Sequence, residues 1–195
     1  MGRREKDEQY ISDQELVRRC SEGDIRAQEA LYKRYFSFAM SVCIRYTGDE
    51  NEAIETVNDS YMKVLDNLNM YDGSRPFKAW YGKILVNTAI DRYRRDIRHA
   101  YDLPLEEIEE TEVVEPEIDA ELSAGEIISL FNCLPVNLKV VFSLYEIEGY
   151  SHDEISRMLG IPEGTSRSNL ARARKMLREL YVKSHSFAGR DNEAI

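Results

Sequence analysis

Cysteine is scarce in this chain of 195 residues, and so is any pattern that cysteine chemistry would need. The three cysteines, Cys20, Cys43 and Cys133, lie far apart and form no CxxC pair. The three histidines do not lie at metal-ligand spacing from them. The sequence therefore indicates neither a zinc site nor a disulfide framework, and we expect the cysteines to be small buried hydrophobic residues in a reducing compartment.

Long hydrophobic runs are missing as well. The longest runs span only a few residues, far fewer than the roughly 20 that a membrane-spanning helix needs. The N-terminal segment MGRREKDEQ has no apolar stretch behind its charges, which argues against secretion. No P-loop, metal-ligand set or Ser/His/Asp arrangement occurs. We therefore expect a cytoplasmic protein that is not an enzyme, has no catalytic residue and needs no cofactor or metal.

The negative charge of the chain is concentrated in one segment. The formal net charge is -10, but residues 102–126 contain eleven acids and neither lysine nor arginine. The rest of the chain is close to neutral and carries basic islands. Because binding depends on local patches and not on the average charge, the net charge does not exclude a nucleic-acid partner.

Helical periodicity runs through most of the sequence, and no strand pattern competes with it. Ser12 and Glu15 have the spacing of a capping box, Asp24 is placed to cap a long helix, and further helices are predicted over about 51–68 and 77–98. This pattern predicts an all-α protein of two small helical domains joined by an acidic flexible linker. The predicted boundaries are a first domain at 1–98, the linker at 99–121, a second domain at 122–183 and a disordered tail at 184–195.

The second predicted domain begins with helices at about 122–134 and 137–147 and ends in a helix-turn-helix. Ser151 and Glu154 form a capping-box signature, and Gly160 is suited to the left-handed conformation at a helix end. Thr165 is placed to cap the second helix. Residues 157–183 contain seven basic residues and only two acids, in an acidic chain. Phosphate is the simplest reason for such a basic helix, although solvated arginines on a helix surface are common.

A second basic stretch follows a turn at residues 71–76. The helix predicted from Phe77, FKAWYGKILVNTAIDRYRRDIR, mixes aromatic and basic residues. Aromatic faces can stack on unpaired bases while basic groups follow the phosphates, a combination suited to single-stranded or melting DNA. Phe77 and Trp80 are expected to pack in the core, whereas Tyr71, in the turn, shows no such structural reason. Asn87 could read a base edge or simply face solvent.

Three segments together resemble the sigma factors of bacterial RNA polymerase, specifically the short two-domain extracytoplasmic-function type. They are GDENEAIETVNDSYMKVL, FKAWYGKILVNTAIDRYRR and LPVNLKVVFSLYEIEGYSHDEISRMLGIPEGTSRSNLARARKML. The resemblance implies that the first domain binds the polymerase and opens the minus-ten promoter element. It implies that the last domain reads the minus-thirty-five element. It further implies core RNA polymerase, duplex promoter DNA and its non-template single strand as partners, together with an anti-sigma factor.

The resemblance also assigns candidate residues to each surface. For polymerase binding these are Glu52, Glu55, Asn58, Asp59 and Met62. For the minus-ten element they are Tyr71, Asp72, Ser74, Arg75, Lys83, Asn87, Asp91 and Arg95. For the minus-thirty-five element they are Thr165, Ser166, Arg167, Asn169, Arg172, Arg174 and Lys175.

Some positions depart from the family pattern. Asn58 and Asp59 stand where the family usually has Gln and Glu, and Ile54 replaces an acid. Asn169 replaces a basic residue, which would weaken phosphate contact and allow adenine readout.

Two other interpretations remain open at this point. An ordinary helix-turn-helix regulator with a sensor domain would explain the last domain but not the aromatic and basic stretch before the linker. A protein that sequesters polymerase would explain the polymerase-binding helix but leave both basic surfaces unused. The linker itself could mimic nucleic-acid charge near the polymerase channel or serve only as a solvated tether.

Overall fold

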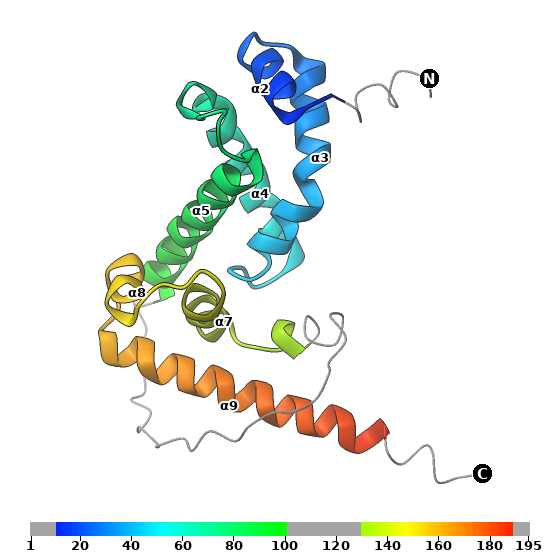
Figure 1. Ribbon diagram of the computed structural model, residues 1–195. Helices are drawn as coiled ribbons and strands as arrows, with labels where there is room; N and C mark the ends of the chain where they lie inside the picture. Colours follow the sequence, from blue (N-terminus) through cyan, green and yellow to red (C-terminus); the bar gives the residue numbers. More distant parts are fainter. Residues whose placement is uncertain (1–10, 101–129, 189–195) are drawn as a thin grey trace, which may run out of the picture. The chain divides into compact units, whose positions relative to one another are not determined.

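The computed structural model describes residues 11–100 and 130–188, and the side chains of residues 11–96 and 130–183. The chain divides into two compact units, Met1–Arg95 and Asp96–Ile195. Within the described ranges every regular element is a helix, so the predicted all-α class is confirmed (Figure 1). None of the described helices is long and apolar enough to cross a membrane. Residues 99 and 100 of the predicted acidic linker belong to helix α5 (Phe77–Ala100), and residues 101–121 of the linker lie outside the described residues.

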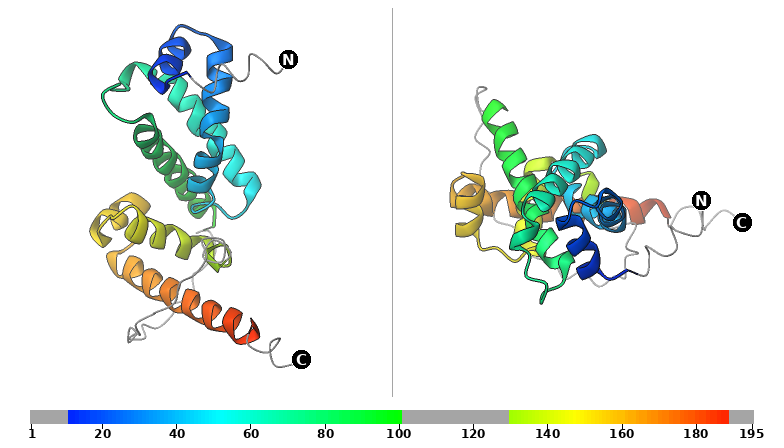
Figure 2. Two further views of the ribbon diagram at one scale, coloured as in Figure 1. Left: turned by 45° about the vertical axis from the view of Figure 1, so that its right-hand side comes forward. Right: turned by 90° about the horizontal axis from the view of Figure 1, so that it is seen from above.

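The described part of the first unit contains four α-helices and one 3-10 turn. In chain order they are α2 (Asp13–Ser21), α3 (Ile25–Cys43), α4 (Glu50–Asp66), the 3-10 turn η1 (Leu68–Met70) and α5 (Phe77–Ala100). Helix α3 packs against α4, ring contacts join α5 to both of them, and α2 packs against α3 (Figures 1 and 2). The predicted turn at residues 71–76 is present as the irregular connection between η1 and α5.

Side-chain caps begin these helices where the sequence predicts. Asp24 Oδ1 accepts hydrogen bonds from the amides of Arg26 and Ala27, at 3.0 and 3.2 Å, and so caps α3. Ser12 Oγ accepts from the amide of Glu15 at 3.2 Å, but the Glu15 carboxylate pairs with Arg18. The capping box predicted at this helix is therefore only half formed, because a neighbouring arginine takes the carboxylate.

An aromatic cluster forms much of the core of the first unit. Phe77 and Tyr81 of α5 are both 1% exposed. The Tyr35 ring of α3 lies 4.9 Å from Phe77, and the Tyr61 ring of α4 lies 6.5 Å from Tyr81, measured between centroids. Such tilted and edge-on pairs add to the free energy gained by burying the rings. The cluster thus fixes α5 against both other long helices, and the predicted core position of Phe77 is confirmed.

The described part of the second unit is built mainly from three α-helices and one π-helical turn. These are α7 (Val136–Phe142), the π turn η2 (Ser143–Ile147), α8 (His152–Leu159) and α9 (Glu163–Ala188). Helices α7 and α8 lie along the same side of α9 (Figure 1). Leu134, Leu138 and Ala173 form a core cluster between α7 and α9. Ile155 and Leu159 of α8 are also buried.

Four details of this unit differ from the sequence-based expectations or lie beyond them. The single helix predicted over 137–147 changes to π geometry at Ser143, where the Glu148 amide donates to the Ser143 carbonyl at 3.0 Å. Helix α9 continues to Ala188, so the disordered tail predicted from residue 184 is wrong for five residues; extending a helix costs less than starting one. Cys133 is exposed at the turn before α7, whereas Cys20 and Cys43 are buried as expected. Most of the helix predicted at 122–134 lies outside the described residues.

Candidate nucleic-acid interface

The helix-turn-helix is present with the predicted turn chemistry. Ser151 and Glu154 form the full reciprocal capping box at the start of α8. Gly160 has φ +71°, a left-handed conformation that lets the chain leave α8 without steric strain. The Ser156 hydroxyl donates to the Ile161 carbonyl at 2.7 Å across the turn. Helix α9 then begins at Glu163, two residues earlier than predicted, so Thr165 lies within its first turn and the cap predicted at Thr165 is wrong.

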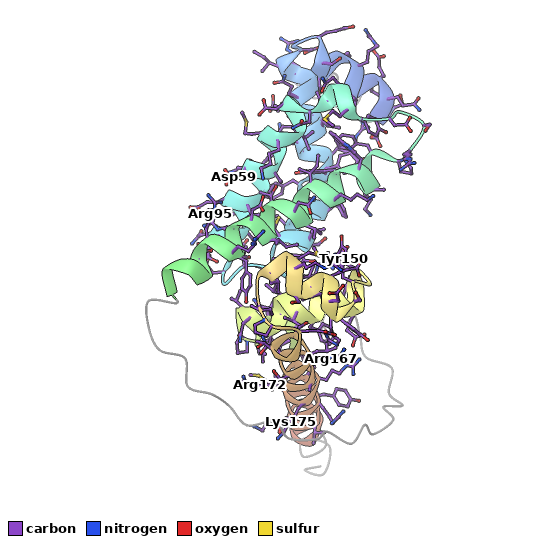
Figure 3. All side chains as sticks on the ribbon, turned by 90° about the vertical axis from the view of Figure 1, so that its left-hand side faces the viewer. Asp59, Arg95, Tyr150, Arg167, Arg172 and Lys175 are labelled. Atoms are coloured by element: carbon purple, nitrogen blue, oxygen red, sulfur yellow. The ribbon has the colours of Figure 1, made fainter. Side chains whose placement is uncertain are left out.

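Only part of the predicted recognition surface on α9 is exposed. Arg167, Arg172 and Lys175 are exposed and follow one another along the helix (Figure 3). Thr165 and Arg174 are half-buried. The described residues contain no ion-pair partner for Arg172 or Lys175, whereas Arg167 pairs with Glu163 of its own first turn.

Ser166 and Asn169 lie on the opposite, inward side of α9. Their exposed fractions are 0% and 8%, respectively. The Ser166 hydroxyl lies 2.9 Å from Nδ1 of His152, the first residue of α8. Direct contact with a DNA groove would require these two side chains to leave the interior. Their burial favours a role in holding α8 and α9 together over the direct contacts that the sequence suggested.

His152 belongs to a network that also reaches the π turn. Its ring stacks on Tyr145 with the centroids 4.5 Å apart and the planes at 23°. Arg174 of α9 contacts two residues of the π turn. Its guanidinium carbon lies 5.9 Å from the Tyr145 ring centroid, and its Nη2 donates to Glu146 Oε1 at 2.7 Å. The network therefore connects η2, α8 and α9. Sequence reasoning missed it because the π turn that turns Tyr145 and Glu146 toward α9 has no recognisable sequence signal.

The surroundings of His152 favour its neutral form. Burial lowers the pKa of the His152 imidazole, and the nearby Arg167 and Arg174 lower it further, while Glu163 opposes them. His152 also lies at the N-terminus of α8, where the helix dipole disfavours a positive charge. Nδ1 of the neutral ring bonds to the Ser166 hydroxyl as donor or as acceptor, depending on the tautomer.

In the first unit, the 71–76 loop is ordered by its own side chains. Asp72 Oδ1 accepts from the Ser74 amide at 3.0 Å and Asp72 Oδ2 accepts from the Ser74 hydroxyl at 2.7 Å. These bonds, with a contribution from Arg75, lower the pKa of the Asp72 carboxyl. The Tyr71 hydroxyl donates to the Arg75 carbonyl at 2.6 Å. The loop therefore has a defined shape with Asp72, Ser74 and Arg75 exposed at its tip.

Tyr71 has a packing role that the sequence did not indicate. Its ring lies 5.5 Å from Phe77 and 5.3 Å from Trp80, between centroids, and the side chain is half-buried. Burial raises the pKa of its hydroxyl, as do Asp13 and Asp72. The phenol thus stays protonated and able to donate to Arg75. The partly exposed Tyr71 and Trp80 rings extend the aromatic cluster from the core to the surface beside the loop.

The predicted residues on α5 share one exposed face. Lys83, Asn87, Asp91 and Arg95 recur at intervals of four, and all four are exposed. Asp91 Oδ2 lies 3.5 Å from Lys63 Nζ on α4, so the acid in this otherwise polar and basic row is paired with a cation. These four residues lie on α5, and the 71–76 loop leads directly into the N-terminus of the same helix.

The polymerase-binding candidates lie on the outer face of α4. Glu55, Asn58, Asp59 and Met62 are exposed, and Met62 is 59% exposed despite being apolar (Figure 3 labels Asp59). Three of the five candidates also have bonds within the unit. Glu52 accepts from the Gly48 amide at 2.7 Å, Glu55 pairs with Arg92 of α5 at 2.7 Å, and Asn58 accepts from the Tyr32 hydroxyl at 2.8 Å.

Known proteins similar to this chain share most of its length. It is 29% identical over 180 residues to the ECF RNA polymerase sigma-E factor of Haemophilus influenzae, covering 87% of this chain and 95% of that protein. It is 29% identical over 181 residues to the RNA polymerase sigma-H factor of Pseudomonas aeruginosa, covering 85% and 91%. It is also similar to the solved structure of the sigma factor RpoE in complex with the anti-sigma factor NepR from Bartonella quintana, at 21% identity and TM-score 0.44, covering 77% and 93%.

Two family models match the two units separately. The model "Sigma-70 region 2" matches residues 31–99, which include α4, the 71–76 loop and α5. The model "Sigma-70, region 4" matches residues 124–177, which include α7, α8 and the first half of α9. Together the matches cover more than half of the chain, in the order that the sequence motifs predict. The chain therefore belongs to the sigma-70 family of RNA polymerase sigma factors.

Proposed function

We propose that this protein binds core RNA polymerase, recognises a two-part promoter and starts transcription there, as a sigma factor of the extracytoplasmic-function type. One observation carries the proposal: a single chain combines a sigma region 2 unit, with its ordered exposed loop, and a region 4 unit, with its exposed basic helix. The protein acts as a specificity subunit in the cytoplasm and makes or breaks no bond itself.

The polymerase surface of the proposal is the outer face of α4. Asp59 and Met62 are its exposed centre, and the Glu55 carboxylate extends it. Carboxylates on this face suit basic residues of a partner helix, and the exposed thioether of Met62 suits an apolar contact because methionine adapts to irregular surfaces. Because Glu55 also pairs with Arg92 of α5, a polymerase residue that took the Glu55 carboxylate would change the charge balance of the DNA-facing helix.

The downstream surface is the 71–76 loop with the outer row of α5. In the proposal, the ordered loop receives an unstacked base of the non-template strand beside Tyr71 and Trp80. Lys83, Asn87 and Arg95 follow the strand. Unstacking a base costs a few kcal/mol, which contacts to the extruded base and the single strand must offset.

The upstream surface is the exposed side of α9. Arg167 and Thr165 lie in the first turns of the helix, where recognition helices usually contact base edges. Arg172 and Lys175 supply phosphate contacts further along. In this proposal Ser166 and Asn169 act from the interior, by setting the position of α9 against α8, and Arg174 is held toward the π turn by Glu146.

An anti-sigma factor is a further proposed partner, supported by family membership. It would compete for the α4 face or cover the DNA-facing surfaces. Affinity purification of the protein from its own cells, in the presence and absence of added core polymerase, tests this point. If a second protein is recovered with this one and added core polymerase displaces it, the proposal is supported. If this protein is recovered with polymerase and DNA alone, the proposal is contradicted.

The main test is reconstituted transcription. Purified protein is mixed with core RNA polymerase and a promoter library, and run-off transcripts are sequenced. Initiation at a shared two-part sequence supports the proposal. Duplex binding that does not depend on polymerase would favour a helix-turn-helix regulator, and a polymerase complex that is inert on every promoter would favour a sequestering protein. Asp59→Lys serves as the matched variant, since reversing this exposed charge is expected to weaken polymerase binding at least tenfold without unfolding α4.

A further inference from the structure

The first described helix, α2, reaches the 71–76 loop through one side chain. Gln14 Nε2 donates a hydrogen bond to the Gly73 carbonyl at 2.9 Å, joining residues that are 59 positions apart. Helix α2 precedes the residues 31–99 that match sigma region 2, so no family assignment covers Gln14. In the described part of the chain, the other hydrogen bonds and ion pairs of residues 72–74 stay within the 71–76 loop.

The neighbouring residue anchors the same end of α2 to the core. Asp13 Oδ1 accepts from Arg34 Nη1 at 2.8 Å, and its other oxygen accepts from the Tyr35 hydroxyl. The Tyr35 ring lies against Phe77, which in turn lies 5.5 Å from Tyr71 at the start of the loop. The N-terminal turn of α2 is therefore connected to the loop both through the aromatic core and directly at Gly73.

These two connections differ in what they can fix. The aromatic contacts hold Tyr71 and Phe77 at the two ends of the loop. The Gln14 bond holds the exposed tip, where a Cβ added at Gly73 would meet no described atom within 4 Å. A loop that is ordered before it meets its ligand avoids the entropy cost of becoming ordered during binding. Because the loop tip is where a displaced base would arrive, its order bears directly on DNA opening.

We propose that Gln14 is a positioning residue for the 71–76 loop, and that α2 is thereby a working part of the promoter-opening surface. This inference rests on the proposed function. Gln14 does not touch DNA; it acts by keeping the Gly73 carbonyl, and with it Asp72 and Ser74, in place. The expected consequence of losing the bond is slower opening of promoter DNA at unchanged affinity for closed duplex.

The sharpest variant is Gln14→Glu. Glutamate has the same length and shape but cannot donate a hydrogen bond, and its charge repels the Gly73 carbonyl. Gln14→Lys keeps a donor at the end of a flexible chain and is the rescue variant. Gln28→Glu is the matched control, because Gln28 lies on neighbouring α3 and its bond to the Tyr61 hydroxyl is made by its backbone carbonyl, which the change leaves in place.

The first readout is rapid amide hydrogen exchange of the free protein. The amides of Ser74 and Arg75, which bond to Asp72, should exchange about threefold to tenfold faster in Gln14→Glu, the range expected for losing one ordinary hydrogen bond. Gln14→Lys should recover at least half of the difference, and Gln28→Glu should match the unchanged protein. Equal exchange in Gln14→Glu and the unchanged protein would overturn the proposal.

The second readout is DNA opening by the complete polymerase complex. A promoter fragment selected by run-off transcription carries 2-aminopurine in the non-template strand of its minus-ten element. Gln14→Glu should open it about threefold to tenfold more slowly while duplex affinity stays within twofold. An unchanged opening rate despite faster exchange overturns the role in opening. If the unchanged protein opens no promoter, the proposed function fails, and hydrogen exchange alone then decides whether Gln14 holds the loop.

Discussion

The two DNA-facing units present their surfaces by different physical means. In the first unit an irregular loop is fixed by an aromatic core beneath it and by polar bonds at its tip. In the second unit a regular helix, α9, follows the turn that ends α8 at Gly160 and is held by the His152 network behind it. The contrast matches the tasks proposed for them: a loop can enclose a single base, whereas a helix fits an intact groove.

Each surface is vulnerable where its own support lies. The loop depends on burial of large rings, so loss of one ring should disturb both stability and opening. The helix depends on local backbone chemistry and on one partly buried imidazole, so small changes at the turn or in pH should shift it. The predictions below test this division, beginning with the change that should be most damaging.

Phe77→Ala should be the most damaging single change. Phe77 is 1% exposed and contacts the rings of Tyr35, Tyr71, Trp80 and Tyr81. Removing it should lower the free energy of unfolding of the first unit by about 3–5 kcal/mol. Chemical denaturation, with hydrogen exchange as the readout for each unit, measures this free energy of unfolding. Asn87→Ala, on the exposed face of the same helix, is the control and should change the free energy by less than about 0.5 kcal/mol. A small effect of Phe77→Ala would mean that the aromatic cluster does not support the loop.

Two glycines four residues apart should respond in opposite directions. Gly160 has φ +71°, where an alanine side chain is strained, so Gly160→Ala should destabilise the second unit by about 1–2 kcal/mol. Gly164 lies inside α9 without a left-handed backbone, and a methyl group added there would meet no atom within 4 Å. Gly164→Ala should therefore stabilise the unit by about 0.5 kcal/mol. Thermal unfolding of the two variants measures the difference. A stabilising Gly160→Ala would contradict the left-handed turn, and a destabilising Gly164→Ala would contradict the open space beside Gly164.

Arg172→Ala and Arg174→Ala should separate a DNA contact from a structural one. Exposed Arg172 has no ion-pair partner among the described residues, so its loss should weaken duplex binding and reduce the slope of log affinity against log salt by about 1. Arg174 bonds to Glu146, so its loss should lower stability as well. Affinity titrations at several salt concentrations and melting curves measure both. An unchanged salt slope in Arg172→Ala would show that this arginine is only solvated.

Acidification should loosen the second unit through His152. The folded environment lowers the pKa of this imidazole below its ordinary value of 6.5, so the unfolded chain binds more protons between the two values. The stabilisation is therefore complete above pH 6.5 and is lost as pH falls through the folded pKa. His152→Phe keeps a ring to stack on Tyr145 but cannot titrate, and subtracting its stability profile between pH 7 and about 5.5 isolates the effect. Identical profiles would remove His152 as the cause.

A much smaller change than the loss of Phe77 is expected from a single hydroxyl of the loop. Tyr71→Phe removes only the group that donates to the Arg75 carbonyl and keeps the ring against Phe77 and Trp80. The loss of this hydrogen bond should destabilise the ordered loop by about 0.5–1.5 kcal/mol and slow promoter opening modestly. Tyr71→Ala, which also removes the ring, should slow opening much more than it weakens duplex binding. Equal opening rates for both variants and the unchanged protein would rule out a single-strand role for Tyr71.

Local sequence patterns were sufficient to predict the helical class, most helix starts and the helix-turn-helix. These features depend on local chemistry: a capping serine or aspartate, a glycine in the left-handed region and a hydrophobic repeat are complete within a few residues. The family followed from motifs in a fixed order. The same patterns ranked Phe77 as a core residue but offered no reason for the position of Tyr71.

Tertiary packing was needed to settle which side chains of each motif face outward and what holds them. The sequence placed Ser166 and Asn169 among the DNA contacts because they lie on the recognition helix, yet both are buried, and the Ser166 hydroxyl bonds to His152 of α8. No sequence pattern indicated that Gln14 reaches Gly73 or that a π turn brings Tyr145 to His152. These contacts join residues that are apart in the chain, and their geometry depends on how whole helices pack, which no local pattern specifies.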